Sequence, residues 1–483
     1  MFDVLVNVFR TLGNVFKIPE LRNKILFTLG MLCVYRIGFW IPVPGVNQTA
    51  LADFFQAAQD SNNALANVGS FIAMFSGGQL SQSTIFGLGI MPYISASIII
   101  QLLGTAVPSI KKLQEEGATG RQKIQEYTRY LTIALCIFQA VSWLMLMSQW
   151  QSQSEPVVYA AMKGQPLWWV MATTSLTAGT VFLMWLGEQI DRYGIGNGAS
   201  MIITAGILTG MPSAVLTLIQ NFDPGGDGIG IPGLLSLACG FVFVVAGAVL
   251  MTVAQRRIPI QQAKHTRGRR VYGGQKSYLP LRVNHSGVMP IIFASSLMIF
   301  PSIIFNQLGA VTAAATAQNP GSGMAAFWDG LVRWLNDSFN MGAFPYILLF
   351  ILMTYFFSFF WITVQFSPED MSKQLKEHGS FIPGLRPGPR TAEYLEAVME
   401  RITFVGAAFL AIIAVIPMLV SSALGVPQNV SQFLGGTGLL IVVSVALDVI
   451  QRIEANLLMR NYAGFLGGDD AGGKARRIRG PRG

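Results

Sequence analysis

Apolar residues are grouped into ten long runs along the 483-residue chain, separated by polar or glycine-rich segments. A helix needs about 20 predominantly apolar residues to cross the hydrocarbon core of a bilayer, and these runs have about that length. The pattern therefore predicts ten membrane-spanning helices. Their expected ranges are 25–43, 85–107, 130–148, 167–187, 199–220, 232–254, 289–309, 343–366, 402–423 and 433–452.

A further apolar run, Val68 to Phe75, is too short to span. Ser76, Gly77 and Gly78 interrupt it, and a span-length run begins at Ile85. A half-length helix at membrane depth is tolerated only where protein or a water-filled cavity surrounds it. The segment is therefore either an interfacial or re-entrant helix without a special role, or a movable stopper in a channel mouth.

The composition agrees with a protein that crosses a membrane several times. Hydrophobic residues make up 52% of the chain and charged residues only 12%, with a mean hydropathy of +0.49, whereas soluble domains carry about 25% charged residues. Residues 2–16 place apolar side chains at helical spacing. This stripe suits either the inner membrane surface or a neighbouring protein surface.

Positive charges are confined to one set of connecting segments. Of the 33 Lys and Arg residues, all but Arg36, Lys163 and Arg333 lie in 1–24 or in alternate segments thereafter. Cytoplasmic loops carry the excess of Lys and Arg in membrane proteins. We therefore expect both termini in the cytoplasm, with large cytoplasmic loops at 255–288 and 367–401.

Ten spans divide into two sets of five, and the second set crosses in the opposite sense because five is odd. This permits two halves related by a pseudo-two-fold axis in the membrane plane, with a path between them. No clear internal repeat demonstrates the symmetry. We expect an N-terminal segment 1–24, two halves at 25–220 and 221–453, and a basic tail 454–483.

The sequence offers no convincing catalytic or metal site. The three histidines have no metal-ligand spacing, and the three cysteines lie far apart in apolar runs, so neither a disulfide nor a bound metal is expected. The segment GDDAGGKA at 468–475 resembles a phosphate-binding loop but ends in Ala475 where Ser or Thr would hold magnesium. We expect no cofactor and no enzymatic activity.

Charged residues are nearly absent from the spans, apart from Arg36, Asp448 and Glu188, which lie near span ends. Coupled transporters for small solutes usually place ionisable groups at membrane depth. An aliphatic path can instead exclude water and ions by dewetting while yielding to a bulky chain. A conduit for a large substrate is favoured, and a secondary transporter of a small solute remains the alternative.

The motifs MFSGG at 74–78 and GLGIMPYISASIIIQLL at 87–103 resemble the plug and the following gate helix of the SecY family of protein-conducting channels. The resemblance implies ten helices in two inverted halves around an hourglass pore. It also implies a plug over about 67–76. Its assigned residues are Val68, Gly69, Ser70, Phe71, Ile72, Ala73, Met74 and Phe75.

The same resemblance assigns a ring of aliphatic side chains to the narrowest point of the pore. From the sequence alone each of these residues is an ordinary buried aliphatic. Ala199 departs from the bulky aliphatic residue that is usual at this position in the family. Either the pore is less tightly sealed on that side, or the correspondence is shifted by one residue. The ring consists of Ile90, Ile94, Ala199, Ile203, Ile292 and Ile441.

The resemblance further implies a lateral gate formed by the second and seventh spans, flanked by the third and eighth. Ser95 and Gln139 correspond to polar residues of that gate. An interhelical hydrogen bond, worth about 0.6–2 kcal/mol, is an equally good explanation for both. Through such a gate, hydrophobic segments would partition sideways into lipid.

The cytoplasmic loops carry the candidate docking residues. Loop 255–288 holds eight basic residues and no acidic one, which suits RNA phosphates, an acidic protein surface or anionic lipids. In the second loop, Arg386 of HGSFIPGLRPGPR corresponds to an arginine that the family associates with motor-driven transport. The docking candidates are Arg256, Arg257, Lys264, Arg269, Arg270 and Arg386.

Together the resemblance implies a channel of the bacterial plasma membrane that passes unfolded secretory polypeptides and recognises signal sequences. The implied partners are the small membrane subunits SecE and SecG, the motor ATPase SecA and the ribosome. The energy would come from the motor or from elongation on the ribosome.

Overall fold

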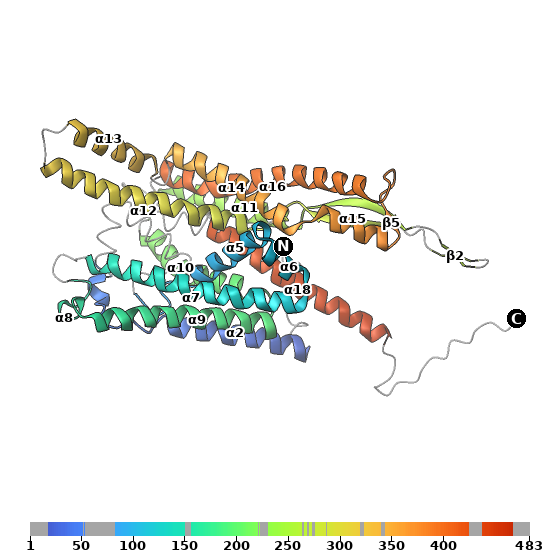
Figure 1. Ribbon diagram of the computed structural model, residues 1–483, viewed down its shortest axis with the longest axis horizontal. Coiled ribbons are helices and arrows are strands. Elements are labelled where there is room, and N and C mark those ends of the chain that lie inside the picture. The colour runs from blue at the N-terminus through green and yellow to red at the C-terminus, as the bar shows by residue number, and fades with distance from the viewer. Residues whose placement is uncertain are drawn as a thin grey trace.

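The computed structural model is predominantly helical, with most helices running along one common direction (Figure 1). It describes residues 18–51, 53, 83–149, 156–220, 222, 230–262, 265–267, 270–272, 276–285, 287–318, 323–339, 343–424 and 437–466. Each of the ten predicted spans overlaps one described helix, although the bounds differ, and that all ten cross a membrane remains a prediction. These helices are α2 (Pro19–Gly38), α5 (Met91–Ala106), α7 (Ala118–Gln149), α9 (Pro166–Tyr193), α10 (Gly198–Gln220), α11 (Ile231–Val253), α12 (Met289–Gln318), α14 (Phe344–Gln365), α16 (Pro389–Leu424) and α18 (Thr437–Leu466).

Within the described residues, six helices are long and apolar enough to cross a membrane. They are α7, α9, α10, α11, α14 and α16, and the apolar part of each is bounded by polar residues or by proline in the first turn. Proline suits the first turn because its missing N–H would have no partner there. The connecting helices are α6 (Pro108–Glu115), α8 (Ala160–Lys163), α13 (Gly323–Ser338) and α15 (Pro368–Glu377).

Helix packing follows the division into an earlier and a later set. Helix α9 packs on α2, α7 and α10, whereas α12, α14 and α16 pack on one another. Helix α18 packs on α10, the last helix of the earlier set, and on α11, the first helix of the later set, and so connects the two sets.

The second predicted span begins later and is shorter than expected. The prediction placed its start at residue 85, but 85–90 form turns and α5 has only 16 residues. Gly89 has a φ of +59°, a left-handed conformation that ends any helix on that side. Pro92 then lies in the first turn of α5.

The loop 255–288 contains strands that the all-helical prediction missed. Strand β1 (Gln255–Gln262) pairs antiparallel with β4 (Lys276–Arg282) and with β5 (Ser380–Phe381). Strands β2 (His265–Arg267) and β3 (Arg270–Tyr272) form a second ribbon. Ile258 and Ile260 are buried while Arg257 and Pro259 are exposed, so the two-residue period of a strand was present in the sequence.

Candidate functional site

The six residues of the predicted ring belong to one apolar cluster. Ile90, Ile203, Ile292 and Ile441 are 1–4% exposed, Ile94 is 9% exposed, and Ala199 is partly buried against them. Ring residues come from both sets of helices, so the cluster fills the space between the halves. Their function as a seal remains a prediction.

Two pairs of predicted ring residues lie one helical turn apart. Ile90 directly precedes α5, and its carbonyl accepts the Ile94 N–H at 3.1 Å. Ala199 and Ile203 are likewise one turn apart on α10, and residues four apart lie on the same helical face. Both pairs therefore present two adjacent layers of aliphatic surface. Trp361 extends the cluster, with its ring 5.4 Å from that of Phe293.

An aromatic group beside the ring was not predicted from the sequence. Phe86 lies parallel to Tyr35 at 6.3 Å and edge-on to Phe39 at 5.7 Å. A Cβ on Gly38 would overlap the Phe86 ring, so only glycine leaves it room. The contact depends on residues 48 positions apart, which no local pattern reveals.

Backbone hydrogen bonds pair the residues that follow α2 with those immediately before α5. Val43 donates to the Ser83 carbonyl at 2.9 Å and Ile85 donates to the Ile41 carbonyl at 3.0 Å. These bonds tie the entry to α5 to the chain that follows α2. This pairing therefore fixes the position of the chain just before the ring residues Ile90 and Ile94.

The two predicted gate residues lie on neighbouring helices. Ser95 is half-buried on α5 and Gln139 is half-buried on α7, and these helices pack together. Ile292 of the ring lies on α12, so the structure brings the predicted gate helices α5 and α12 to the same apolar cluster. Their lateral separation remains a prediction.

Three of the predicted docking residues lie on the strands β1 and β3. Arg256 and Arg257 are exposed on β1, opposite Leu281 and Pro280 of β4. Arg270 lies on β3.

Arg386 is exposed in the turn between Gly384 and Gly388, which have φ values of +87° and +132°. Its carbonyl accepts a hydrogen bond from Thr391 Oγ1 at 3.0 Å. The turn thus holds the backbone of Arg386 while the residue stays exposed.

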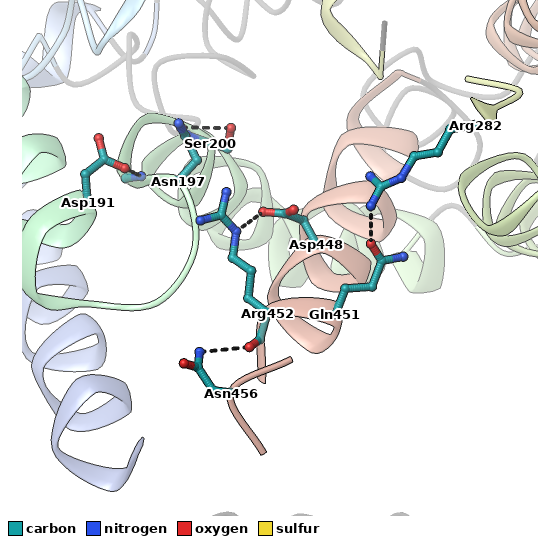
Figure 2. Close-up of polar contacts among 9 residues, drawn as sticks. Asp191, Asn197, Ser200, Arg282, Asp448, Gln451, Arg452 and Asn456 are labelled. Atoms are coloured by element: carbon teal, nitrogen blue, oxygen red, sulfur yellow. Dashed lines mark hydrogen bonds and ion pairs between the residues drawn. The ribbon is translucent and has the colours of Figure 1, made fainter. Parts of the chain in front are cut away.

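Hydrogen bonds join side chains within α18 and connect α18 to β4 (Figure 2). Arg452 donates to Asp448 at 2.8 Å. Burial raises the pKa of Asp191 at the end of α9, and the Arg452 charge partly offsets that rise. Gln451 accepts from Arg282 of β4 at 3.1 Å. The C-terminal part of α18 therefore contacts the sheet that carries the basic loop.

Two local hydrogen bonds order the turn between α9 and α10 (Figure 2). Gly198 donates its N–H to Asp191 Oδ1 at 2.7 Å, and Ser200 donates its N–H to Asn197 Oδ1 at 3.0 Å. Asn197 thus caps α10, which carries Ala199 and Ile203.

A bidentate ion pair joins α7 to α9 at the same end of the molecule. Arg129 donates Nε and Nη2 to the two carboxylate oxygens of Glu188, at 2.8 and 2.6 Å. Bidentate, charge-assisted hydrogen bonds of this kind are stronger than hydrogen bonds between neutral groups.

Several sequence predictions fall on residues outside those that the structure describes. They are the plug residues 68–75, the amphipathic stripe 2–16, the basic tail beyond 466, and the docking candidates Lys264 and Arg269.

Comparisons with known proteins agree with the fold and the motifs. The sequence model of the SecY family matches residues 84–450. The protein translocase subunit SecY of Thermotoga maritima is 40% identical over 469 residues, covering 97% of this chain and 99% of that protein. The corresponding Streptomyces scabiei protein is 40% identical over 457 residues, covering 94% of this chain and 99% of that protein.

A solved structure described as a protein conducting channel shares the fold. Its TM-score is 0.53 with 18% sequence identity, and the match covers 94% of this chain and 97% of that one. The family match spans most of the chain, and the relatives match over nearly their entire length. The chain belongs to the SecY family.

Proposed function

We propose that this chain forms the pore of a protein-conducting channel that passes unfolded secretory polypeptides across the plasma membrane of a bacterium. The observation that carries the proposal is the buried aliphatic ring. Both halves contribute to it, and five of its six members are less than 10% exposed. Such a constriction keeps out water and ions yet can widen for side chains of any kind, because dispersion contacts are not directional.

Both termini lie in the cytoplasm in this proposal, because the basic segments share one side of the membrane. The β1–β4 sheet and the Arg386 turn then face the cytoplasm. Figure 1 supports this arrangement, since β5, α15 and β2 lie at one end of the helical body.

Residues 67–76 act as the plug that covers the ring when no substrate is present. Its flanking glycines, Gly77 and Gly78, allow the segment to swing away. Deleting 67–76 is expected to raise the resting ion conductance of planar bilayers. A conductance equal to that of the parent would reject a plug at this position.

Hydrophobic segments leave sideways between α5 and α12. Leu, Ile and Val each gain several tenths of a kcal/mol in lipid, whereas a central charge costs about 2.5–3.5 kcal/mol. Ser95 and Gln139 lie on α5 and α7 beside this exit and would hydrogen-bond in the closed state.

The partners follow from the exposed basic residues and the family. SecE and SecG complete the membrane complex, and anionic lipids contact the basic loops. The ribosome and the motor SecA dock on β1, β3 and the Arg386 turn. The motor or elongation supplies the energy, and signal sequences enter at the gate.

Reconstituted vesicles test the proposal against transport of a small solute. With SecE, SecG, SecA and ATP, an unfolded preprotein is expected to become protease-protected inside vesicles that contain the chain. Vesicles that accumulate a small solute but never protect the preprotein would reject the proposal.

A further inference from the structure

Two buried hydroxyl groups from different helices bond to the turn that carries Arg386. Thr391 of α16 is 2% exposed, and its Oγ1 donates to the Arg386 carbonyl at 3.0 Å. Ser372 of α15 is 4% exposed, and its Oγ donates to the Gly388 carbonyl at 2.7 Å. Helices α15 and α16 also pack on each other. Neither hydroxyl belongs to the residues that the sequence singled out for docking.

The backbone of this turn contains two residues with unusual conformational freedom. Gly384 and Gly388 lie on either side of Arg386 with φ values of +87° and +132°, and glycine loses more freedom on folding than any other residue. Thr391 holds the turn twice, because its N–H also donates to the Gly388 carbonyl, at 2.9 Å. The Ser372 hydroxyl approaches the same carbonyl from α15. Side chains of two helices therefore restrain a turn that its glycines would leave adaptable.

An apolar cluster supports the turn from below. Ile382 is 4% exposed and packs with Leu395 of α16, which is fully buried, while Leu385 and Leu375 pack against the same cluster. Helix α15 contacts β5, and Figure 1 shows the two together at one end of the helical body. Arg386 is exposed. The turn therefore presents an exposed arginine from a buried, well-packed base.

We propose that Ser372 and Thr391 are positioning residues for the docking arginine: their hydroxyls hold the Arg386 turn in the conformation that the motor binds. The inference rests on the docking role of Arg386 in the proposed function. A turn that already has its bound conformation loses less freedom on binding. Without either hydroxyl, the turn has that conformation for only part of the time, and the apparent affinity for the motor falls by the same fraction.

A purely structural role for the hydroxyls is separated from positioning by a matched control on the same helix. Thr403 of α16 is also 2% exposed, and its Oγ1 donates to the Met399 carbonyl at 2.6 Å, within the helix and away from the turn. Threonine and valine are both β-branched, so Thr391→Val and Thr403→Val remove the same group. Thr391→Ser keeps the hydroxyl and tests rescue.

Preprotein protection at increasing motor concentration tests the proposal. Vesicles contain the full chain with SecE and SecG, and SecA is titrated in the presence of ATP. We expect the half-saturating SecA concentration to rise about 2- to 10-fold in Thr391→Val and in Ser372→Ala, the effect of one lost hydrogen bond. The rate at saturating SecA should stay near that of the parent. Thr391→Ser and Thr403→Val should behave like the parent.

Hydrogen exchange in the same vesicles without SecA reports on the turn itself. Backbone amides of residues 384–392 should exchange faster in Thr391→Val and Ser372→Ala than in the parent, because local opening becomes easier. The rest of α16 should exchange at the parental rate, which also shows that the variants are folded. Unchanged exchange of 384–392 in both variants would contradict a restraint by these hydroxyls.

Two results of the SecA titration would overturn the inference. A parental half-saturating concentration in both Thr391→Val and Ser372→Ala would mean that the hydroxyls do not position the arginine. An equal rise in Thr403→Val would mean a general loss of stability. Arg386→Glu, measured beside them, reports the docking role: parental export from that variant would reject docking, whereas the exchange rates would still show whether the hydroxyls hold the turn. Either proposal can therefore fail alone.

Discussion

Replacing Ile203 by asparagine tests whether the ring is a dry seal. Ile203 is 4% exposed on α10 within the cluster between the two halves. A buried amide without a partner costs about 1–3 kcal/mol, whereas an amide exposed to water in an open channel keeps its hydration. The closed state alone is therefore destabilised, by about 1–3 kcal/mol, and its ratio to the open state should fall about 5- to 150-fold.

Single-channel recording in planar bilayers measures this ratio as the resting open probability. Ile413→Asn is the matched control, because Ile413 is 0% exposed but lies in the separate cluster around α14 and α16. Both variants should lose stability, and only Ile203→Asn should conduct at rest. Ile203→Val, which keeps the site apolar, should stay closed. Parental conductance in folded Ile203→Asn, or equal leakage from Ile413→Asn, would refute a seal at the ring.

Further predictions concern the cytoplasmic side. Arg386→Glu should abolish motor-driven export while abundance and membrane insertion stay near normal; export at the parental rate would reject docking there. Arg129→Met should lower the free energy of unfolding by about 1–2 kcal/mol, discounted for the solvent exposure of the arginine, because Glu188 loses its partner; an unchanged thermal midpoint would contradict this. Burial, with a nearby guanidinium, lowers the pKa of His285 below its usual 6.5. The neutral imidazole is thus favoured in the fold, so stability should be lost as the pH falls through about 6.5, and His285→Gln should remove that loss.

Long apolar runs made the helices predictable, because spanning a bilayer requires a length and composition that few other structures share. The ring residues could be named only through the resemblance to the SecY family. From the sequence alone, Ile203 and Ile413 are both aliphatic residues in apolar runs. Tertiary packing separates them into two clusters.

Short or long-range features were harder to predict. The start of α5 depends on the left-handed Gly89, which the apolar pattern around it concealed. In strand β1 only Ile258 and Ile260 show the alternation of buried and exposed positions. Two residues within a basic loop were too few to predict a strand. The amphipathic period of α13 was readable from Phe327 to Trp334 but lay in a segment treated as a connection.

Cross-linking of a stalled polypeptide tests the central claim most directly. A photoreactive residue is placed at Ile94, at Ile441 or, as a control, at Ile413, and a secretory chain is arrested during transport. The account predicts cross-links from Ile94 and Ile441, which belong to the cluster between the halves, and none from Ile413. Failure at both ring positions, or equal cross-linking at Ile413, would contradict a polypeptide path through the ring.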